Sequence, residues 1–229
     1  MLEALKAAGE DTWFQIGDKD FATHVLRTDM LRRGETLTEA TLALSRRFGI
    51  TARVLPMTDG AVRTRFATEG GELSFQEYFV RERLLPRLGG ITFAGASTAV
   101  VSAQVAGALQ VADLVVIGPS NPLISIAPIL ALVGDLMPRT RTIAVTPIVG
   151  GLALKGPTVE MMRALGHEPS PVEVARMYRD AASTFILDER DGSLGAAIEE
   201  LGYRLIVFDT VMRDGGRALA EAVLALSNA

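Results

Sequence analysis

The sequence contains no cysteine, and its 229 residues include one tryptophan and two histidines. The absence of cysteine excludes a disulfide framework, a zinc site made of thiolates and a cysteine nucleophile. A chain without disulfides suits the reducing cytosol, so we expect a cytoplasmic protein.

The sequence has no excess of positive charge and no long apolar run. Lysine and arginine number 23 against 27 acidic residues, for a formal net charge of −4, so we expect no nucleic-acid partner. The longest apolar stretches, Val111–Gly118 and Ile143–Leu154, are too short or too interrupted by glycine and proline to span a bilayer. The first residues, MLEALKAAGEDTW, mix acidic and basic side chains and do not resemble a signal peptide. We therefore expect no membrane partner.

The chain divides into two zones. Residues 1–95 are rich in charge, and residues 96–229 alternate apolar runs with glycine and proline turns. In the first zone, the spacing of apolar residues predicts two amphipathic helices, Phe21–Arg33 and Thr36–Phe48. β-branched and aromatic residues predict a small antiparallel group of strands at Ala52–Met57, Val62–Ala67, Glu72–Val80 and Ile91–Ala94. We interpret residues 1–95 as an inserted helical and small-strand subdomain.

The pattern of residues 96–229 predicts a portion of a Rossmann-like α/β core. Strands buried on both faces are expected at the short apolar runs Leu114–Ile117 and Thr142–Thr146, and a third and a fourth strand at Phe185–Leu187 and Arg204–Phe208. Helices are expected near Thr158–Leu165, Pro171–Ala182, Leu194–Leu201 and Ala218–Leu226. This alternation predicts a mostly parallel, three-layer sheet. Such a fold normally begins with a strand and a glycine turn, whereas this chain begins with a helix end, so we expect the first strand or strands to be missing.

The first candidate site directly follows the first predicted strand of the core, where open α/β sheets bind their ligands. Gly118 permits close backbone approach, and the segment offers hydroxyl and amide groups beside a helix start that favours anions. The candidate residues are Gly118, Pro119, Ser120, Asn121 and Ser125. A capped turn, in which Ser120 or Asn121 satisfies free helix amides, explains the same residues equally well.

A second glycine loop follows the strand at Thr142–Thr146. Gly150 lies in this loop, and Lys155 precedes the next predicted helix, where a lysine can reach a phosphate. A solvated surface charge is the alternative for Lys155. Two glycine loops at neighbouring strand ends together predict a crevice the size of a nucleotide or phosphate.

Other segments offer polar side chains with ordinary structural explanations. Asp18 directly precedes a helical pattern and can cap it, and His24 is either a general base or a surface residue that pairs with a neighbour. Thr58 and Asp59 present a hydroxyl and a carboxylate, but Asp-Gly is also an ordinary hairpin turn. The acidic segment Asp188–Asp191 can bind a metal or cap the following turn. The sequence has no His-x-x-x-His or Cys-x-x-Cys pattern and no Walker lysine loop.

Six strings occur in the order and spacing of one family. They are Ile16–His24 (IGDKDFATH), Pro56–Asp59 (PMTD), Phe75–Val80 (FQEYFV), Gly118–Pro122 (GPSNP) with its continuation Ser125–Ile129 (SIAPI), Thr146–Gly151 (TPIVGG) and Lys155–Thr158 (KGPT). The chain thereby resembles the 2-phospho-L-lactate transferase family (CofD/FbiA type) over essentially its whole length.

The resemblance implies an activity and its partners. Members of this family join a phospholactyl or phosphoenolpyruvyl group, carried by a guanosine diphosphate-linked donor, to the deazaflavin Fo. They release GMP, require Mg²⁺ and serve coenzyme F-420 biosynthesis. The strand-end loops at Gly118 and Gly150 would cradle the guanosine diphosphate. The residues that would bind the deazaflavin are Gln15, Gly17, Asp18, His24, Thr58 and Asp59; Gln15 stands where the family often has Lys or Arg.

The resemblance also implies what this chain lacks. The family's amino-terminal glycine loop and its acidic motifs are absent from the sequence, so no catalytic residue and no metal ligand is assigned here. The donor's lactyl or enolpyruvyl group stays open, and base rates favour a homodimer. The alternative is a non-catalytic regulator that binds a nucleotide or a UDP-sugar, because a related family that controls cell-wall precursor supply shares the Pro-Met-Thr-Asp string.

Overall fold

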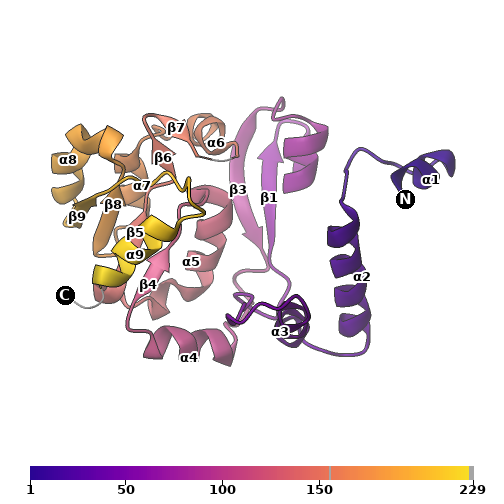
Figure 1. The fold of residues 1–229 in the computed structure, drawn as a ribbon. Coiled ribbons are helices and arrows are strands. Elements are labelled where there is room, and N and C mark those ends of the chain that lie inside the picture. The colour runs from indigo at the N-terminus through magenta and orange to yellow at the C-terminus, as the bar shows by residue number, and fades with distance from the viewer. Residues whose placement is uncertain (155, 227–229) are drawn as a thin grey trace. The chain divides into compact units, whose positions relative to one another are not determined.

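The computed structural model describes residues 1–154 and 156–226, and the chain forms two compact units, Met1–Val105 and Ala106–Ala229. Figure 1 shows the elements. The helices are α1 (Leu2–Ala7), α2 (Asp18–Arg32), α3 (Leu37–Arg47), α4 (Ala103–Val111), α5 (Ala127–Val133), α6 (Thr158–Ala164), α7 (Pro171–Tyr178), α8 (Gly195–Glu199) and α9 (Arg217–Leu226). The strands are β1 (Arg63–Thr68), β2 (Gly71–Ser74), β3 (Leu88–Ala94), β4 (Val115–Ile117), β5 (Thr142–Val145), β6 (Ile148–Val149), β7 (Leu152–Ala153), β8 (Thr184–Leu187) and β9 (Arg204–Val207).

The first unit combines a helix pair with an antiparallel sheet of order β2-β1-β3. The fully buried Phe66 of β1 stacks on Tyr78, with ring centroids 5.1 Å apart. Helices α2 and α3 join through a small core of Met30, Ala40 and Leu44. Thr36 caps α3 in a capping box, because its hydroxyl accepts from the N–H of Glu39 and its own N–H donates to the Glu39 carboxylate. Both predicted helices are thus confirmed.

Two strand predictions for this unit are wrong. The segment Ala52–Met57 forms no strand, since Pro56 has no N–H to donate and Thr58 alone forms an isolated bridge, with Val101. The strand predicted at Glu72–Val80 ends at Ser74, and a π-helical turn, Glu77–Arg81, follows. The Glu77 carboxylate accepts a hydrogen bond from the Ser74 N–H at 2.8 Å, just before the helical residues Phe75 and Gln76 that lead into this turn.

The second unit is built on a parallel sheet of order β4-β5-β8-β9. One face is covered by α6, α7 and α8, whose buried residues pack on strand residues such as Ala144, Phe185 and Leu187. Leu219 and Val223 of α9 cover the opposite face. The sheet therefore lies between two helical layers, and the predicted Rossmann-like α/β class is confirmed.

The sequence predicts all four core strands but not the short antiparallel pair β6 and β7. Burial on both faces is confirmed for β5 and is wrong for β4, which lies at an edge of the sheet and leaves Val116 exposed. After β4 the chain forms a π-helical turn, Pro122–Ile126, which leads directly into α5. No helix within residues 1–154 and 156–226 combines the length and apolarity that crossing a bilayer requires.

Candidate functional site

The strongest candidate site is the carboxyl edge of the parallel sheet. Because the four strands are parallel, the loops that follow them leave from one edge, which is where open α/β sheets bind ligands. These loops begin at Gly118 after β4, Thr146 after β5, Asp188 after β8 and Phe208 after β9. Two of the four loops contain the predicted nucleotide-binding residues.

In the loop after β4, Asn121 acts as a helix cap. Its Oδ1 accepts hydrogen bonds from the N–H groups of Leu123 at 2.9 Å and Ile124 at 3.3 Å. The side chain is almost buried, and its Nδ2 lies 3.7 Å from the Met161 sulfur of α6. The capping interpretation of Asn121 is therefore confirmed. Its amide fixes the start of the π-helical turn and attaches the loop to α6.

The neighbouring residues of this loop are more accessible. Ser120 is exposed, while Gly118, Pro119 and Ser125 are half-buried. In the described part of the chain, the hydroxyls of Ser120 and Ser125 have no hydrogen-bond partner. These two hydroxyls are therefore free to bind a ligand, whereas the first N–H groups of the helical turn are already bound by Asn121.

The loop after β5 is a tight hairpin. Thr146 is fully buried, and its hydroxyl both donates to the Ile148 carbonyl at 2.8 Å and accepts from the Ile148 N–H at 3.2 Å. Gly150 and Gly151 connect β6 to β7 with φ of 58° and 74°, so two consecutive positive-φ residues form the turn. Lys155 lies outside the described residues. A glycine turn of this kind lets a ligand approach the backbone without side chains in the way.

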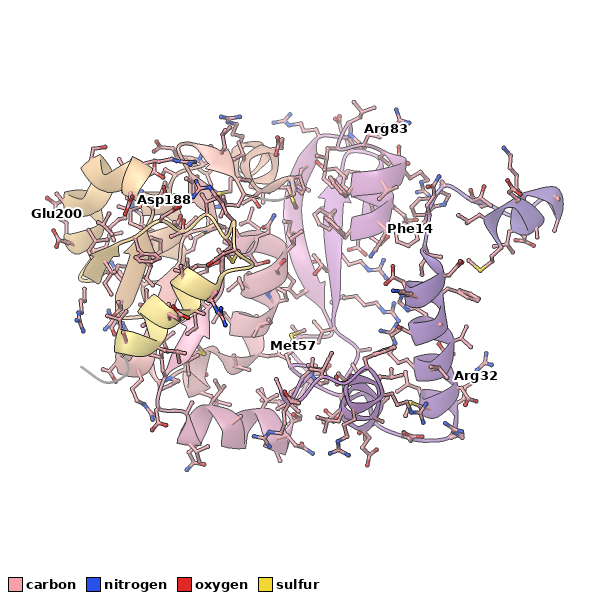
Figure 2. The ribbon with its side chains drawn as sticks, in the orientation of Figure 1. Phe14, Arg32, Met57, Arg83, Asp188 and Glu200 are labelled. Atoms are coloured by element: carbon pink, nitrogen blue, oxygen red, sulfur yellow. The ribbon has the colours of Figure 1, made fainter. Side chains whose placement is uncertain are left out.

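Two buried carboxylates join the loops of this edge. Asp188 (Figure 2) accepts from the Arg190 N–H at 3.1 Å, and from the N–H and the hydroxyl of Thr210 at 2.9 Å each. Asp191 accepts from the N–H of Gly150 at 2.8 Å. The loops after β5, β8 and β9 are therefore held together by side-chain oxygens that bind backbone and hydroxyl donors.

These carboxylates do not fit a magnesium site. Mg²⁺ binds carboxylate oxygens in near-octahedral geometry, whereas these two carboxylates accept hydrogen bonds that connect the loops. Within the described residues, no group of three or more His, Asp or Glu side chains is placed to hold a metal. The capping interpretation of Asp188–Asp191 is the one that the contacts support.

The first unit holds the predicted acceptor-binding residues of the Ile16–His24 string. Gly17 is the N-cap of α2, and no side chain caps this helix, so Asp18 is its first residue rather than its cap. An aspartate in the first turn still interacts favourably with the helix dipole. The Nδ1 atom of His24 accepts a hydrogen bond from Nη2 of Arg27 at 2.6 Å. Gln15, like these residues, is exposed.

Thr58 and Asp59 form hydrogen bonds that connect separate segments of the same unit. The Thr58 hydroxyl donates to the Val100 carbonyl at 2.6 Å and accepts from the Gly60 N–H at 3.0 Å. Asp59 accepts the Thr38 N–H at the start of α3 at 2.6 Å. No hairpin forms at Asp59–Gly60, so the ordinary-turn prediction is wrong in detail: these side chains bridge segments that are far apart in sequence.

Asp191 and Thr210 are the residues at the carboxyl edge whose role the sequence did not reveal. Each follows a predicted strand by a few residues, which was a usable signal. Their specific partners, Gly150 and Asp188, lie 41 and 22 residues away, so local patterns could not identify them.

Comparison with known proteins gives a consistent result. The family model described as 2-phospho-L-lactate transferase CofD matches residues 2–216. The chain is 40% identical over 228 residues to the 2-phospho-L-lactate transferase of Methanosarcina acetivorans, covering 98% of this chain and 74% of that protein. It is 38% identical over 226 residues to the protein of the same name from Methanosarcina mazei, covering 97% and 75% of the two chains.

Among solved structures, the chain resembles the crystal structure of a UPF0052 family protein from Bacillus halodurans. The TM-score is 0.59 at 14% identity, over 87% of this chain and 70% of the other. At this identity the similarity concerns the fold alone.

Proposed function

Since the chain belongs to the 2-phospho-L-lactate transferase CofD family, we propose that it is a transferase of coenzyme F-420 biosynthesis. In this proposal it transfers a phospholactyl or phosphoenolpyruvyl group from a guanosine diphosphate-linked donor to the deazaflavin Fo and releases GMP. The observation that carries the proposal is the carboxyl edge of the sheet, where a glycine hairpin held by Asp191 adjoins the other strand-end loops.

The carboxyl edge has the chemistry that a diphosphate requires. The hydroxyls of Ser120 and Ser125 have no hydrogen-bond partner within the described residues and can donate to anionic oxygens, and the Gly150–Gly151 turn lets a phosphate approach its backbone without side chains in the way. We assign the donor to Gly118, Pro119, Ser120, Ser125, Gly150 and Lys155, with Asn121 as the residue that positions the loop after β4. Asp191 positions the Gly150 turn in the same way, through its hydrogen bond to the Gly150 N–H.

The acceptor is assigned to the first unit. Gln15, Gly17, Asp18 and His24 are exposed and contribute donors and acceptors suited to a polar heterocycle and its hydroxyls. Thr58 and Asp59 support this region through their bonds to Val100 and Thr38 rather than through free side chains. We propose accordingly that residues 1–95 are the insertion that binds the acceptor, and residues 96–229 the core that binds the donor.

The reaction that follows is a substitution at phosphorus. A hydroxyl of Fo attacks the phosphorus that carries the lactyl or enolpyruvyl group; a phosphorus–oxygen bond forms, the bond to GMP breaks and the hydroxyl loses its proton. The residues of this chain contribute by positioning the two substrates and by binding negative charge. Mg²⁺ would supply charge neutralisation on the phosphate oxygens, but the described residues do not form its site, and no step is assigned to it here.

Equilibrium titration of the purified chain tests the proposal. We expect saturable binding of GDP and of Fo, and no comparable binding of a UDP-sugar such as UDP-N-acetylglucosamine. Tight UDP-sugar binding without Fo binding would instead indicate the regulator. The homodimer and the cytoplasmic location stay predictions, for which sedimentation and fractionation are the measurements.

A further inference from the structure

The amino edge of the parallel sheet, opposite to the proposed donor loops, encloses a hollow of about 210 Å³. Three of its lining residues are apolar: Leu114, Ile143 and Leu226 belong to the cluster that α9 covers. Pockets for drug-sized ligands measure roughly 300–1,000 Å³. The hollow therefore suits a small ligand rather than a nucleotide.

The register of the strands places polar side chains over these apolar residues. Ile143 of β5 pairs with Thr184 of β8, and Thr184 pairs with Arg204 of β9. Residues paired in this way project from the same face of a sheet. Thr184 and Arg204 therefore lie on the face that α9 covers, at the mouth of the hollow.

Two guanidinium groups line the hollow. Arg141 donates from Nη1 to the Ala112 carbonyl, which fixes this side chain while leaving its other N–H groups available. Arg204 forms no ion pair and no side-chain hydrogen bond within residues 1–154 and 156–226. Asp113 also lines the hollow, but among the described residues it pairs with neither arginine. Among the described lining residues, two arginines accompany one carboxylate, so the net charge of these side chains is positive.

We propose that this hollow is a second ligand site, distinct from the donor loops, which binds the phosphate group of a small ligand. Arginine presents a planar set of donors that matches phosphate oxygens. Arg141 and Arg204 supply this charge-assisted recognition, and the hydroxyls of Thr140 and Thr184 add neutral donors. The site does not depend on the proposed transferase activity.

Titration of the ¹⁵N-labelled chain with inorganic phosphate, at constant ionic strength, tests the site by location and by affinity. We expect saturable amide shifts at Leu114, Arg141, Thr184 and Arg204. Arg141→Gln and Arg204→Gln each weaken phosphate binding about tenfold or more, because a hydrogen bond to a charged group is lost. Arg217→Gln, at the exposed start of α9, makes the same charge change and leaves the affinity unaltered.

Shifts that do not saturate, that are equal in all three variants, or that occur only in the loops after β4 and β5 would overturn the proposal. A parallel titration with glycerol 3-phosphate separates the two sources of the phosphate group. Binding of both probes at the same amides identifies a phosphorylated metabolite as a ligand, and binding of inorganic phosphate alone identifies the free ion; either supports the site.

Discussion

The Oδ2 atom of Asp191 accepts a hydrogen bond from the backbone N–H of Gly150 at 2.8 Å, across 41 residues of sequence. Asp191 follows β8, and Gly150 forms the tip of the hairpin after β5. Asp191 is nearly buried, whereas Gly150 is exposed, so this bond attaches an exposed glycine turn of the proposed donor site to the folded core.

Asp191→Ala removes this acceptor. We expect the free energy of unfolding to fall by about 1 kcal/mol and the affinity for GDP to fall about tenfold, since the hydrogen bond that fixes the turn is lost. Urea unfolding and GDP titration measure the two effects. Asp191→Asn keeps a carbonyl oxygen at the same place and should retain most of the stability and of the GDP affinity. The control Asp135→Ala, at an exposed turn, should change neither quantity. GDP affinity in Asp191→Ala equal to that of the unaltered chain would contradict the positioning role.

Asp188 and Thr210 act as a unit at the same edge. Both are buried, and two hydrogen bonds of 2.9 Å connect them. We expect Asp188→Ala and Thr210→Val each to destabilise the chain, and their double-mutant cycle in chemical unfolding to give a coupling energy of about 1–2 kcal/mol. Additive effects would show that the two residues stabilise the fold independently.

Two buried tyrosines of the second unit should respond differently to loss of the hydroxyl. The Tyr178 hydroxyl has no hydrogen-bond partner within the described residues, whereas the Tyr203 hydroxyl donates to the Ala175 carbonyl at 2.8 Å. Tyr178→Phe should leave the stability unchanged or raise it, while Tyr203→Phe should lower it by about 1 kcal/mol. Thermal unfolding of the two variants measures this difference. Equal destabilisation would mean that Tyr178 has a partner.

The same tyrosines predict a loss of stability at alkaline pH. Burial raises the pKa of both phenols above the ordinary value of 10.0. In the unfolded chain they ionise near that ordinary value, so between it and the raised pKa the folded chain binds more protons. Stability is therefore fully present below pH 10 and declines as the pH rises beyond it. Unfolding followed between pH 9 and about pH 11 should show this decline, with a shallower slope for Tyr178→Phe; an identical slope would contradict the assignment.

Replacing two glycines of the first half of the chain by alanine should have opposite effects on stability. Gly95 has φ +87°, and a Cβ built there would lie 2.2 Å from the Ala61 carbonyl oxygen, whereas a Cβ at Gly107 of α4 would meet nothing within 4 Å. Gly95→Ala should therefore destabilise the chain by about 3 kcal/mol or more. Gly107→Ala should stabilise it by up to about 1 kcal/mol, because alanine favours the helix. Chemical unfolding of both variants measures these changes. An unchanged free energy of unfolding in Gly95→Ala would show that the backbone there relaxes.

The parallel core was readable from the sequence because its strands are continuous apolar runs between turns. Thr142–Thr146 predicted β5, for example, to within one residue. The alternation in Glu72–Val80 was misleading, because Glu77 binds the Ser74 N–H locally and turns the chain into a π-helical turn that buries Tyr78. Local spacing cannot show such a competition between a strand and a side-chain cap.

The candidate site was predictable in its location and not in its contacts. Gly118 and Gly150 follow strands, and the parallel order brings their loops to one edge. The donor–acceptor pairs Asp191 with Gly150 and Asp59 with Thr38 join segments that meet only in the folded chain. The sequence indicated polar residues at these places but could not say that their oxygens were already bound.

The most direct test of the central claim is to incubate the chain with Fo, the guanosine diphosphate-linked donor and Mg²⁺, and to quantify the products by chromatography and mass spectrometry. We expect GMP and a phosphodiester of Fo in equal amounts, with GMP formation dependent on Fo. Absence of the Fo product together with saturable binding of a UDP-sugar would contradict this claim.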